Sequence, residues 1–403
     1  MESLDLPLTG LVVVDMGRFI AAPFCALLLG QLGARVIKLE KLAGDDSRRS
    51  GPFVGSTSLY FESYNGSKES VAVDFRHERG RDLVRKVLQH CDVVVENFRP
   101  GTMDAMGLSF GVLCELNPGI IMTSVSGFGQ DGPYSGRAAF DAIAQAMSGL
   151  MSLTGTEEGQ PLLSGAFVAD YSAGLYATVA TLAALYGRSK DGCGGRHIDV
   201  SLLESAVSLL GPGLTDFLTT GRGQARTGNR DRISAPANAF PTRDGWVYLH
   251  AGTDALWQRL CSAMGSSGLV DNPEFASQAA RLLRAAAVEA VVARWTRQMT
   301  SREVEDAGRR FGFPCARVAG LPEVAGDDQL RFRGAWVGYS GADSGEVRSF
   351  GGALATAFGR SLGRGRGPAL GEHTVRVLRD MVGLREDEVS ELAQAGIIGT
   401  LGA

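Results

Sequence analysis

Cysteine and histidine are scarce in this sequence. Among 403 residues there are six cysteines, at positions 25, 91, 114, 193, 261 and 315, and five histidines. The cysteines are isolated and form no C-x-x-C pair. Disulfide frameworks and zinc sites need paired or clustered ligands of these types, so the spacing argues against both. We therefore expect no metal site.

Long apolar runs and an excess of positive charge are also missing. No apolar run reaches the roughly 18 residues of a membrane span, and residues 1–5 carry no basic stretch that would open a signal peptide. The net charge of −4 at pH 7 leaves no positive field for nucleic acid or for an anionic membrane. These absences predict a cytoplasmic protein with no nucleic-acid and no membrane partner.

The glycine motifs of common nucleotide-binding loops are absent too. Residues 15–23, which follow the first predicted strand, contain the single glycine Gly17 and lack the pattern G-x-G-x-x-G. No G-x-x-x-x-G-K-[ST] loop occurs either. Glu40 ends the second predicted strand, where an NAD enzyme has its ribose-binding acid, but without the glycines the backbone could not approach a pyrophosphate closely. The sequence therefore argues against NAD binding.

What the sequence does contain is an alternation of strands and helices. With 44% hydrophobic residues, the chain can bury one large core and a second, smaller one. We predict strands at residues 10–15, 34–40, 70–74, 92–96 and 119–125, and helices at 23–32 and 78–90. This alternation favours an α/β fold with a doubly wound, Rossmann-like parallel sheet, whose ligands bind beyond the carboxyl ends of the strands.

The composition of the later sequence changes twice to that of a linker, which indicates a second domain. We expect a large domain whose N-terminal part covers residues 1–220, a glycine-rich charged linker at 221–235, a small α+β domain at 236–315, and a second linker at 316–334. Residues 335–403 are too few for an independent core, so we expect them to return to the large domain.

Asp170 is the most conspicuous polar residue of the first domain. No basic residue occurs from Ser164 to Leu185. Burial without a cationic neighbour raises the pKa of a carboxyl group and leaves its anion nucleophilic. Asp170 also precedes an alanine-rich amphipathic stretch at residues 172–186, where an aspartate commonly caps a helix. Taken alone, these residues leave both a helix cap and a catalytic carboxylate open.

Six segments spread along nearly the whole chain together resemble the family III CoA-transferases, a group related to α-methylacyl-CoA racemase. They are Gly33-Ala34-Arg35-Val36-Ile37-Lys38-Leu39-Glu40-Lys41, Tyr64-Asn65-Gly66-Ser67-Lys68-Glu69-Ser70, Val95-Glu96-Asn97-Phe98-Arg99-Pro100-Gly101, Ser126-Gly127-Phe128-Gly129-Gln130-Asp131-Gly132-Pro133, the Asp170 segment, and Gly371-Glu372-His373-Thr374. The resemblance implies that Asp170 attacks the thioester of an acyl-CoA and forms a mixed anhydride. It also implies CoA thioesters as substrates and no permanently bound cofactor.

The resemblance further implies which residues contact CoA. The matching positions are Lys41, Val73, Arg76, Asn97, Phe98 and Met106, with Arg18 and Arg137 as substitutes for phosphate contacts that this sequence rearranges. Cationic side chains and strand-end amides suit phosphates, whereas Phe98 and Met106 offer apolar contact. Without the resemblance, solvated surface charge and core packing explain these residue types equally well.

The sequence also departs from the family at the acceptor site. Formyl-CoA transferase has a glutamine where this chain has Ile20, an arginine at Ala105 and a tyrosine at Phe140, so formyl-CoA and oxalate are disfavoured as substrates. The related racemases need a histidine at Phe140, because moving a proton between two faces of a carbon takes two acid–base groups. Racemisation and a non-catalytic CoA-binding role are therefore the weaker alternatives.

The acid that accepts CoA is less evident from the sequence. Arg230 and Arg232 could bind a second carboxylate, or could be no more than part of a charged linker. We favour CoA transfer from succinyl-CoA to a small dicarboxylate. The resemblance implies an interlocked homodimer in which each chain closes a ring around its partner, and the long connections on both sides of the small domain are compatible with that arrangement.

Overall fold

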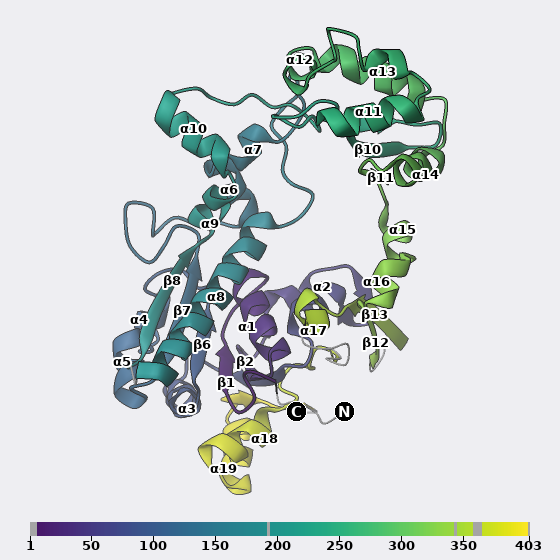
Figure 1. Cartoon of the computed structure of the whole chain (residues 1–403). Coiled ribbons are helices and arrows are strands. Elements are labelled where there is room, and N and C mark those ends of the chain that lie inside the picture. The colour runs from purple at the N-terminus through teal and green to yellow at the C-terminus, as the bar shows by residue number, and fades with distance from the viewer. Residues whose placement is uncertain (1–5, 192–193, 342–344, 358–364, 402–403) are drawn as a thin grey trace. The chain divides into compact units, whose positions relative to one another are not determined.

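The structure is a computed structural model that describes residues 6–191, 194–341, 345–357 and 365–401. The chain divides into two compact units (Figure 1). The first contains Met1–Met151, Leu163–Leu218 and Asp328–Ala403, and the second contains Ser152–Leu162 and Thr219–Asp327. The C-terminal segment thus belongs to the first unit, while the short segment Ser152–Leu162 joins the second, a feature that the sequence did not indicate.

A seven-stranded, mainly parallel sheet forms the centre of the first unit. In spatial order its strands are β14 (Ile398–Gly399), β5 (Glu69–Val73), β2 (Arg35–Glu40), β1 (Val12–Asp15), β6 (Val93–Glu96), β7 (Ile121–Ser126) and β8 (Arg196–Ser201). Only β14 runs antiparallel to its neighbour. Counted along the chain, the six parallel strands have the order 3-2-1-4-5-6, which is the Rossmann order. The predicted α/β class is confirmed.

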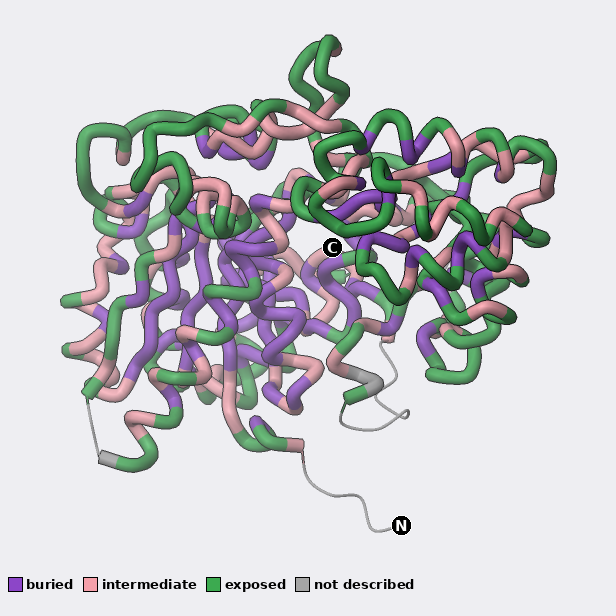
Figure 2. Tube along the Cα trace, turned by 45° about the horizontal axis from the view of Figure 1, so that its top comes forward, coloured by how far each residue is buried: buried purple, intermediate pink, exposed green. Residues whose placement is uncertain are grey.

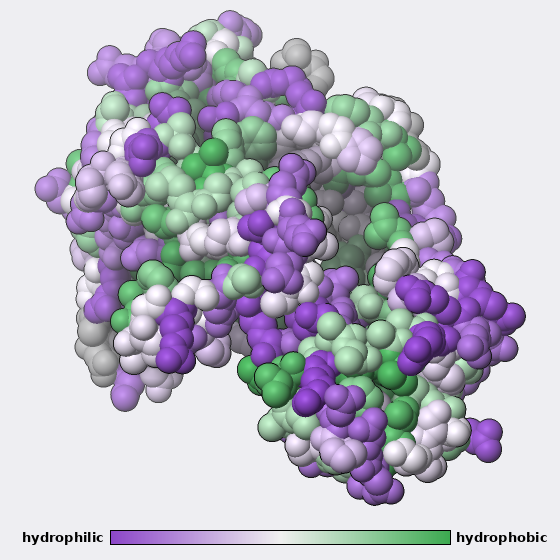
Figure 3. Space-filling model, turned by 90° about the horizontal axis from the view of Figure 1, so that it is seen from above, coloured by the Kyte–Doolittle hydropathy of each residue, from purple (hydrophilic) through white to green (hydrophobic). Residues whose placement is uncertain are grey.

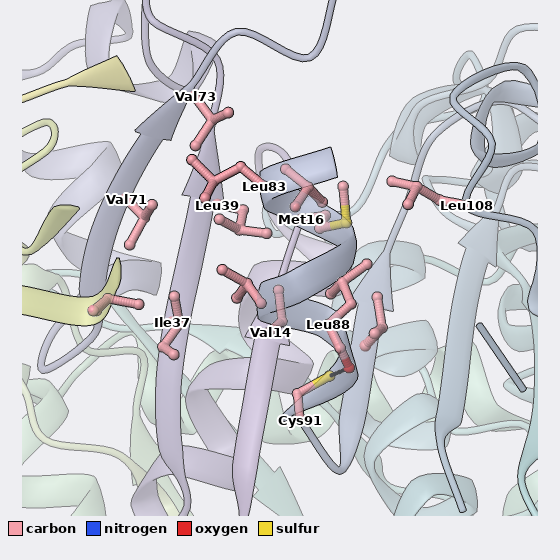
Figure 4. Close-up of a cluster of buried hydrophobic side chains, with 14 of the residues drawn as sticks. Val14, Met16, Ile37, Leu39, Val71, Val73, Leu83, Leu88, Cys91 and Leu108 are labelled. Atoms are coloured by element: carbon pink, nitrogen blue, oxygen red, sulfur yellow. Dashed lines mark hydrogen bonds between the residues drawn. The ribbon is translucent and has the colours of Figure 1, made fainter. Parts of the chain in front are cut away.

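Both faces of the sheet are covered by helices, as expected for strands that are apolar on each side. In Figure 2 the buried residues concentrate in the strands and in the helix sides that face them. On one face, Val14, Ile37 and Leu39 from the strands pack against Leu83 and Leu88 (Figure 4). The covering helices of this face are α3 (Glu78–Gln89), α5 (Phe110–Leu116), α18 (Thr374–Val377) with the π-helical turn η3 (Leu378–Val382), and α19 (Glu386–Gln394).

The opposite face is covered chiefly by α1 (Ala21–Gln31) and α8 (Val168–Asp191), which pack side by side (Figure 1). Their contact is close because small residues meet there. A Cβ atom added to Gly174 of α8 would lie 2.9 Å from the backbone oxygen of Ala21 and 2.8 Å from the Phe24 ring. Glycine at position 174 therefore sets the distance between these two helices.

Shorter elements complete the first unit. They are η1 (Asp46–Arg49), β3 (Phe53–Val54), β4 (Thr57–Ser58), α2 (Leu59–Asn65), α4 (Thr102–Ala105), α6 (Asp141–Met147), α9 (Leu202–Ser208), α16 (Asp328–Phe332), β12 (Trp336–Gly341), β13 (Gly345–Phe350) and α17 (Ala353–Ala357). Two further helices, α7 (Leu150–Leu153) and α10 (Pro212–Thr220), lie where the chain passes between the units.

The second unit has its own small core around Trp257, which is 1% exposed. Its antiparallel sheet has the order β11 (Cys315–Arg317), β10 (Trp246–His250), β9 (Ala237–Pro241). Its helices are α11 (Asp254–Ala263), η2 (Ser267–Leu269), α12 (Gln278–Leu283), α13 (Ala285–Thr296), α14 (Ser301–Phe311) and α15 (Leu321–Ala325). The predicted first linker, 221–235, and most of the predicted second linker, 316–334, belong to this compact unit.

One helix, Val168–Lys190, is long and apolar enough by length and composition to cross a membrane. Its alanine-rich inner side packs against α1 and the sheet, so the same composition serves a core helix here. On the face of the protein seen in Figure 3, hydrophilic residues lie among the hydrophobic ones.

The α1–α8 contact yields a stability prediction. Gly174→Ala should lower the free energy of unfolding by about 1–3 kcal/mol, because the added methyl group overpacks the interface. Gly187→Ala on the same helix is the matched control, since a Cβ there meets nothing within 4 Å. It should stabilise by about 0.5–1 kcal/mol through helix propensity. Urea unfolding of both variants measures the difference, and equal effects would contradict the packing argument.

Candidate active site

The carboxyl ends of β1 and β6 meet at the switch point of the sheet, where ligands of such folds bind. The loop after β1 carries Arg18, and the loop after β6 carries Asn97. The Asn97 amide bonds the Arg18 backbone in both directions, accepting from its N–H at 2.7 Å and donating to its carbonyl oxygen at 2.8 Å. The two loops are thereby fixed to one another.

A buried cluster of charged side chains holds the loop after β1 in place. Asp15, which is fully buried, accepts hydrogen bonds from the Gly17 N–H at 2.8 Å and from the Lys68 ammonium at 2.6 Å. Lys38, also fully buried, donates to the Gly17 carbonyl oxygen at 2.8 Å and pairs with Asp45 at 3.0 Å. Both polar groups of the Gly17 backbone are thus held by buried charges.

Phe19 ends this loop in a left-handed backbone conformation, with φ 60°, which is uncommon for a residue with a side chain. Its ring packs edge-on against Phe140, with ring centroids 5.9 Å apart. Phe19, Ile20 and Phe140 line two cavities of about 460 and 440 Å³, and Asp170 lines both. The structure therefore brings three candidate residues, Ile20, Phe140 and Asp170, together at one place.

Asp170 lies in the first turn of α8, because the helix begins at Val168. The alternative that Asp170 is the helix cap is wrong. Asp141 has that role: its Oδ1 accepts hydrogen bonds from the N–H groups of Ala169 at 2.8 Å and of Asp170 at 3.3 Å. Gln145 holds the other Asp141 oxygen at 2.7 Å.

The surroundings of Asp170 keep its carboxyl group reactive. Burial, followed by the negative charge of Asp141, raises the pKa of Asp170 to about 7. Among the described residues, no side chain donates a hydrogen bond to this carboxylate. A partly buried anion without a compensating donor or cation is a stronger nucleophile than a solvated one.

A third cavity of about 120 Å³ lies at the ends of β1, β2 and β6. It is here called the nucleotide cavity after the ligand that the family resemblance implies. Lys41, Phe98 and Met106 line it together with Arg18. The turn that carries Phe98 is held by Glu96, whose carboxylate accepts from the Phe98 N–H at 2.7 Å. Burial raises the pKa of Glu96 to about 7. Four of the expected CoA contacts thus share one cavity.

The other expected CoA contacts lie in different settings. Val73 is 1% exposed and belongs to the hydrophobic core (Figure 4), so it supports β5 from inside. Arg76 is exposed just after β5. Arg137 lines the 460 Å³ cavity together with Asn97, and its guanidinium lies 4.5 Å from the centre of the Tyr134 ring.

Arg230 and Arg232 belong to the second unit. Arg230 pairs with Glu289 at 2.7 Å, and this pairing raises the pKa of Arg230. Arg232 is exposed and donates to the Ala225 carbonyl oxygen at 2.7 Å.

Several residues at these cavities escaped the sequence interpretation. Phe19 and Asp141 are neighbours of candidates that it did name, but only the fold shows that they adjoin Asp170. Asp46 pairs with Arg18 and Lys41, which line the nucleotide cavity, and with Arg49. Both Asp46 and Arg49 lie in the charged run at residues 45–49, which four residues separate from the end of β2. Their place soon after the end of a strand was a usable signal, because ligands of parallel sheets bind there.

The fold and the cavities fit an enzyme that binds a nucleotide-bearing substrate at the strand ends and presents one carboxylate to it. The model of CoA-transferase family III matches residues 8–374 of the chain. The chain therefore belongs to CoA-transferase family III and is an enzyme of the CoA-transferase class, as the six sequence segments predicted.

Individual relatives extend the match along the chain. The succinyl-CoA–D-citramalate CoA-transferase of Chloroflexus aurantiacus is 34% identical over 396 residues, which are 97% of this chain and 98% of that protein. The human succinyl-CoA:glutarate CoA-transferase is 33% identical, over 97% of this chain and 90% of that one. The crystal structure of a CAIB/BAIF family protein from Brucella suis superposes with a TM-score of 0.84 at 32% identity, over 94% of this chain and all of that one.

The electrostatics of Asp170 lead to a pH-dependent stability prediction. Its pKa is raised in the fold, so the stability that the protonated group provides is lost as pH rises through about 7. The loss begins near the unfolded pKa of 3.8 and is complete just above pH 7. Asp170→Asn should therefore be more stable than the parent by a smaller amount at pH 5 than at pH 8, where the difference is on the order of 1 kcal/mol after solvent screening.

Asp131→Asn is the matched control, because Asp131 is exposed. Thermal unfolding of the parent and both variants at pH 5 and 8 measures the effect. A variant at position 170 that is less stable than the parent at pH 8 would show that the carboxylate is compensated.

Proposed function

We propose that the protein transfers CoA from succinyl-CoA to a small dicarboxylic acid through an aspartyl mixed anhydride on Asp170. The observation that carries this proposal is the position of Asp170, an uncompensated carboxylate with a raised pKa at the border of two cavities. The choice of substrates is supported by relatives that are named as succinyl-CoA-dependent transferases to citramalate, malate and glutarate.

The reaction needs no redox step. An Asp170 carboxylate oxygen attacks the thioester carbonyl carbon of succinyl-CoA, and the carbon–sulfur bond breaks with its electron pair on sulfur. The products are the CoA thiolate and an anhydride between succinate and Asp170. The acceptor carboxylate then attacks the Asp170 carbonyl carbon and displaces succinate. The thiolate finally attacks the carbonyl carbon of the bound acceptor, which releases the new thioester and the Asp170 carboxylate.

The cavities supply binding groups for CoA. The nucleotide cavity has apolar walls from Phe98 and Met106 for adenine, and Lys41 and Arg18 supply positive charge for phosphates. Arg76 does not line this cavity, but its charge acts on Lys41. The 460 Å³ cavity extends from Arg18, Asn97 and Phe98 to Asp170. A pantetheine arm in this cavity would bring the thioester to Asp170, with Arg137 beside it, while Val73 supports the site from the core.

The 440 Å³ cavity on the other side of Phe140 is the proposed place of the acyl group. Ile20 and Phe140 give it apolar walls, and the ring of Phe140 cannot carry a proton, which opposes racemisation. For the second carboxylate of a dicarboxylate we propose Arg230 or Arg232. Arg232 is the stronger candidate of the two because Arg230 already pairs with Glu289.

Replacing the nucleophile tests the mechanism. Asp170→Ala should lower CoA transfer by at least about 10³-fold while CoA affinity stays within a factor of about two, because CoA is bound by other loops. Hydroxylamine added after succinyl-CoA should give a hydroxamate at Asp170 that peptide mass spectrometry detects. In the parent protein kcat/KM should fall as pH drops below about 7, since protonation removes the nucleophile.

A CoA-transfer assay with several acceptor acids distinguishes the substrates. Purified protein is incubated with succinyl-CoA and a panel of carboxylic acids, and new CoA thioesters are read by mass spectrometry. Asp328→Ala is the control, because Asp328 is 94% exposed on α16. Full activity of the Asp170 variant would overturn the mechanism, and thioesters of monocarboxylic acids alone would overturn the dicarboxylate.

An interlocked homodimer is the assembly that we propose. Exposed apolar side chains follow one side of α8, with Leu175 51%, Val179 63% and Tyr186 68% exposed. Their spacing of four and seven residues places them on one helix face. Single exposed apolar residues are ordinary, but a stripe along a helix favours an interface. The return of the C-terminal segment to the first unit is compatible with a chain that closes a ring.

Interlocked chains cannot separate without opening a ring. When two differently tagged preparations are mixed under native conditions, we expect no heterodimer over hours, and we expect it after unfolding and refolding. Affinity capture of one tag followed by detection of the other measures the exchange. Heterodimer within minutes, or a monomer by light scattering at low micromolar concentration, would contradict interlocking and leave the catalytic mechanism untouched.

A further inference from the structure

Three cationic side chains converge on one carboxylate beside the nucleotide cavity. Asp46 opens η1 and pairs with Arg18, with Lys41 at 2.9 Å and with Arg49 at 2.6 Å. The side chain of Asp46 is 22% exposed, whereas those of its three partners are 44–59% exposed. The cations therefore face solvent, and among the described residues Asp46 is the one carboxylate with which they form ion pairs.

The other acids near this cluster are already neutralised. Glu40 pairs with Arg48 at 2.6 Å, and Asp45 pairs with the buried Lys38 at 3.0 Å. Positive charge is thus in excess around Asp46. Burial lowers the pKa of Lys41, and the charges of Arg18, Arg49 and Arg76 lower it further, while the negative charge of Asp45 opposes them in part.

We infer that Asp46 occupies the place of a phosphate group of CoA and is displaced when the nucleotide binds. The role assigned to Asp46 rests on the proposed function, because CoA supplies the phosphate. The fitting group is a phosphate monoester, which CoA carries as the 3′-phosphate of its adenosine. Such a group brings about −1.5 to −2 charges and three acceptor oxygens, whereas Asp46 offers one charge and two oxygens.

The displacement of Asp46 by the phosphate lowers the net affinity for CoA. The ion pairs with Asp46 must be broken before the phosphate gains its own, so the net gain on binding is smaller than three new ion pairs would suggest. A CoA-transferase must release a CoA thioester in every cycle. Moderate affinity keeps that release fast, since product release limits many enzymes.

Two ligands that differ in one phosphate test the exchange. Asp46→Asn should bind CoA about fivefold more tightly than the parent by isothermal titration, because one competing charge is lost. Its affinity for 3′-dephospho-CoA should change by less than about twofold, since that ligand lacks the group that replaces Asp46. Asp46→Glu keeps the charge and should resemble the parent with both ligands.

Asp306→Asn is the matched control, because Asp306 pairs with Arg309 at the same three-residue spacing but lies in the second unit. It should change neither affinity. Arg49→Gln should remove most of the parent's preference for CoA over 3′-dephospho-CoA. This variant keeps the test decisive if Asp46→Asn unfolds.

Equal tightening for both ligands, or weaker binding of CoA to Asp46→Asn, would overturn the role of Asp46. A parent protein that binds both ligands equally would overturn it as well, while leaving the proposed function intact. A parent protein that binds neither ligand would instead overturn the proposed function itself.

Discussion

The geometry of the site depends on the buried pairing of Lys68 and Lys38 with Asp15. Charges are costly to bury, and this cluster is tolerated because each ammonium group meets a carboxylate and a backbone oxygen. The cluster holds both polar groups of Gly17, and Gly17 begins the loop that carries Arg18 and Phe19. The nucleotide cavity and both cavities at Asp170 are lined by that loop, so all three depend on two buried lysines.

The sequence predicted the central sheet better than its edges. Strands β1, β2, β5, β6 and β7 are buried on both faces and read as apolar runs. β8 escaped because it is an edge strand in which Arg196, His197 and Asp199 interrupt the apolar residues. Residues 316–334 were expected to be a linker, but the structure has α15 at Leu321–Ala325 and α16 at Asp328–Phe332 there.

The sequence pointed to single residues of the candidate site but not to pairs that are distant along the chain. The absence of cations around Asp170 made it a candidate, although the sequence alone left a helix cap open as well. Its partner Asp141 lies 29 positions earlier, and only the packing of α6 beside α8 brings the two together. The outcome is a division of roles between two acids: Asp141 satisfies the free N–H groups of the helix, and Asp170 is left without that stabilisation.

The position of Asp170 also depends on how the far end of α8 is held. Near its far end, Arg188 donates to the Gly119 carbonyl oxygen at 2.9 Å and pairs with Asp92 at 2.7 Å, which anchors the helix at the amino ends of β7 and β6. Asp170 lies 18 residues away, or about 27 Å along the helix axis. A tilt of about one degree at the anchor would move the carboxylate by about 0.5 Å, close to the tolerance of a catalytic geometry. Substitutions remote from the cavities can therefore shift the Asp170 carboxylate without touching any residue that lines them.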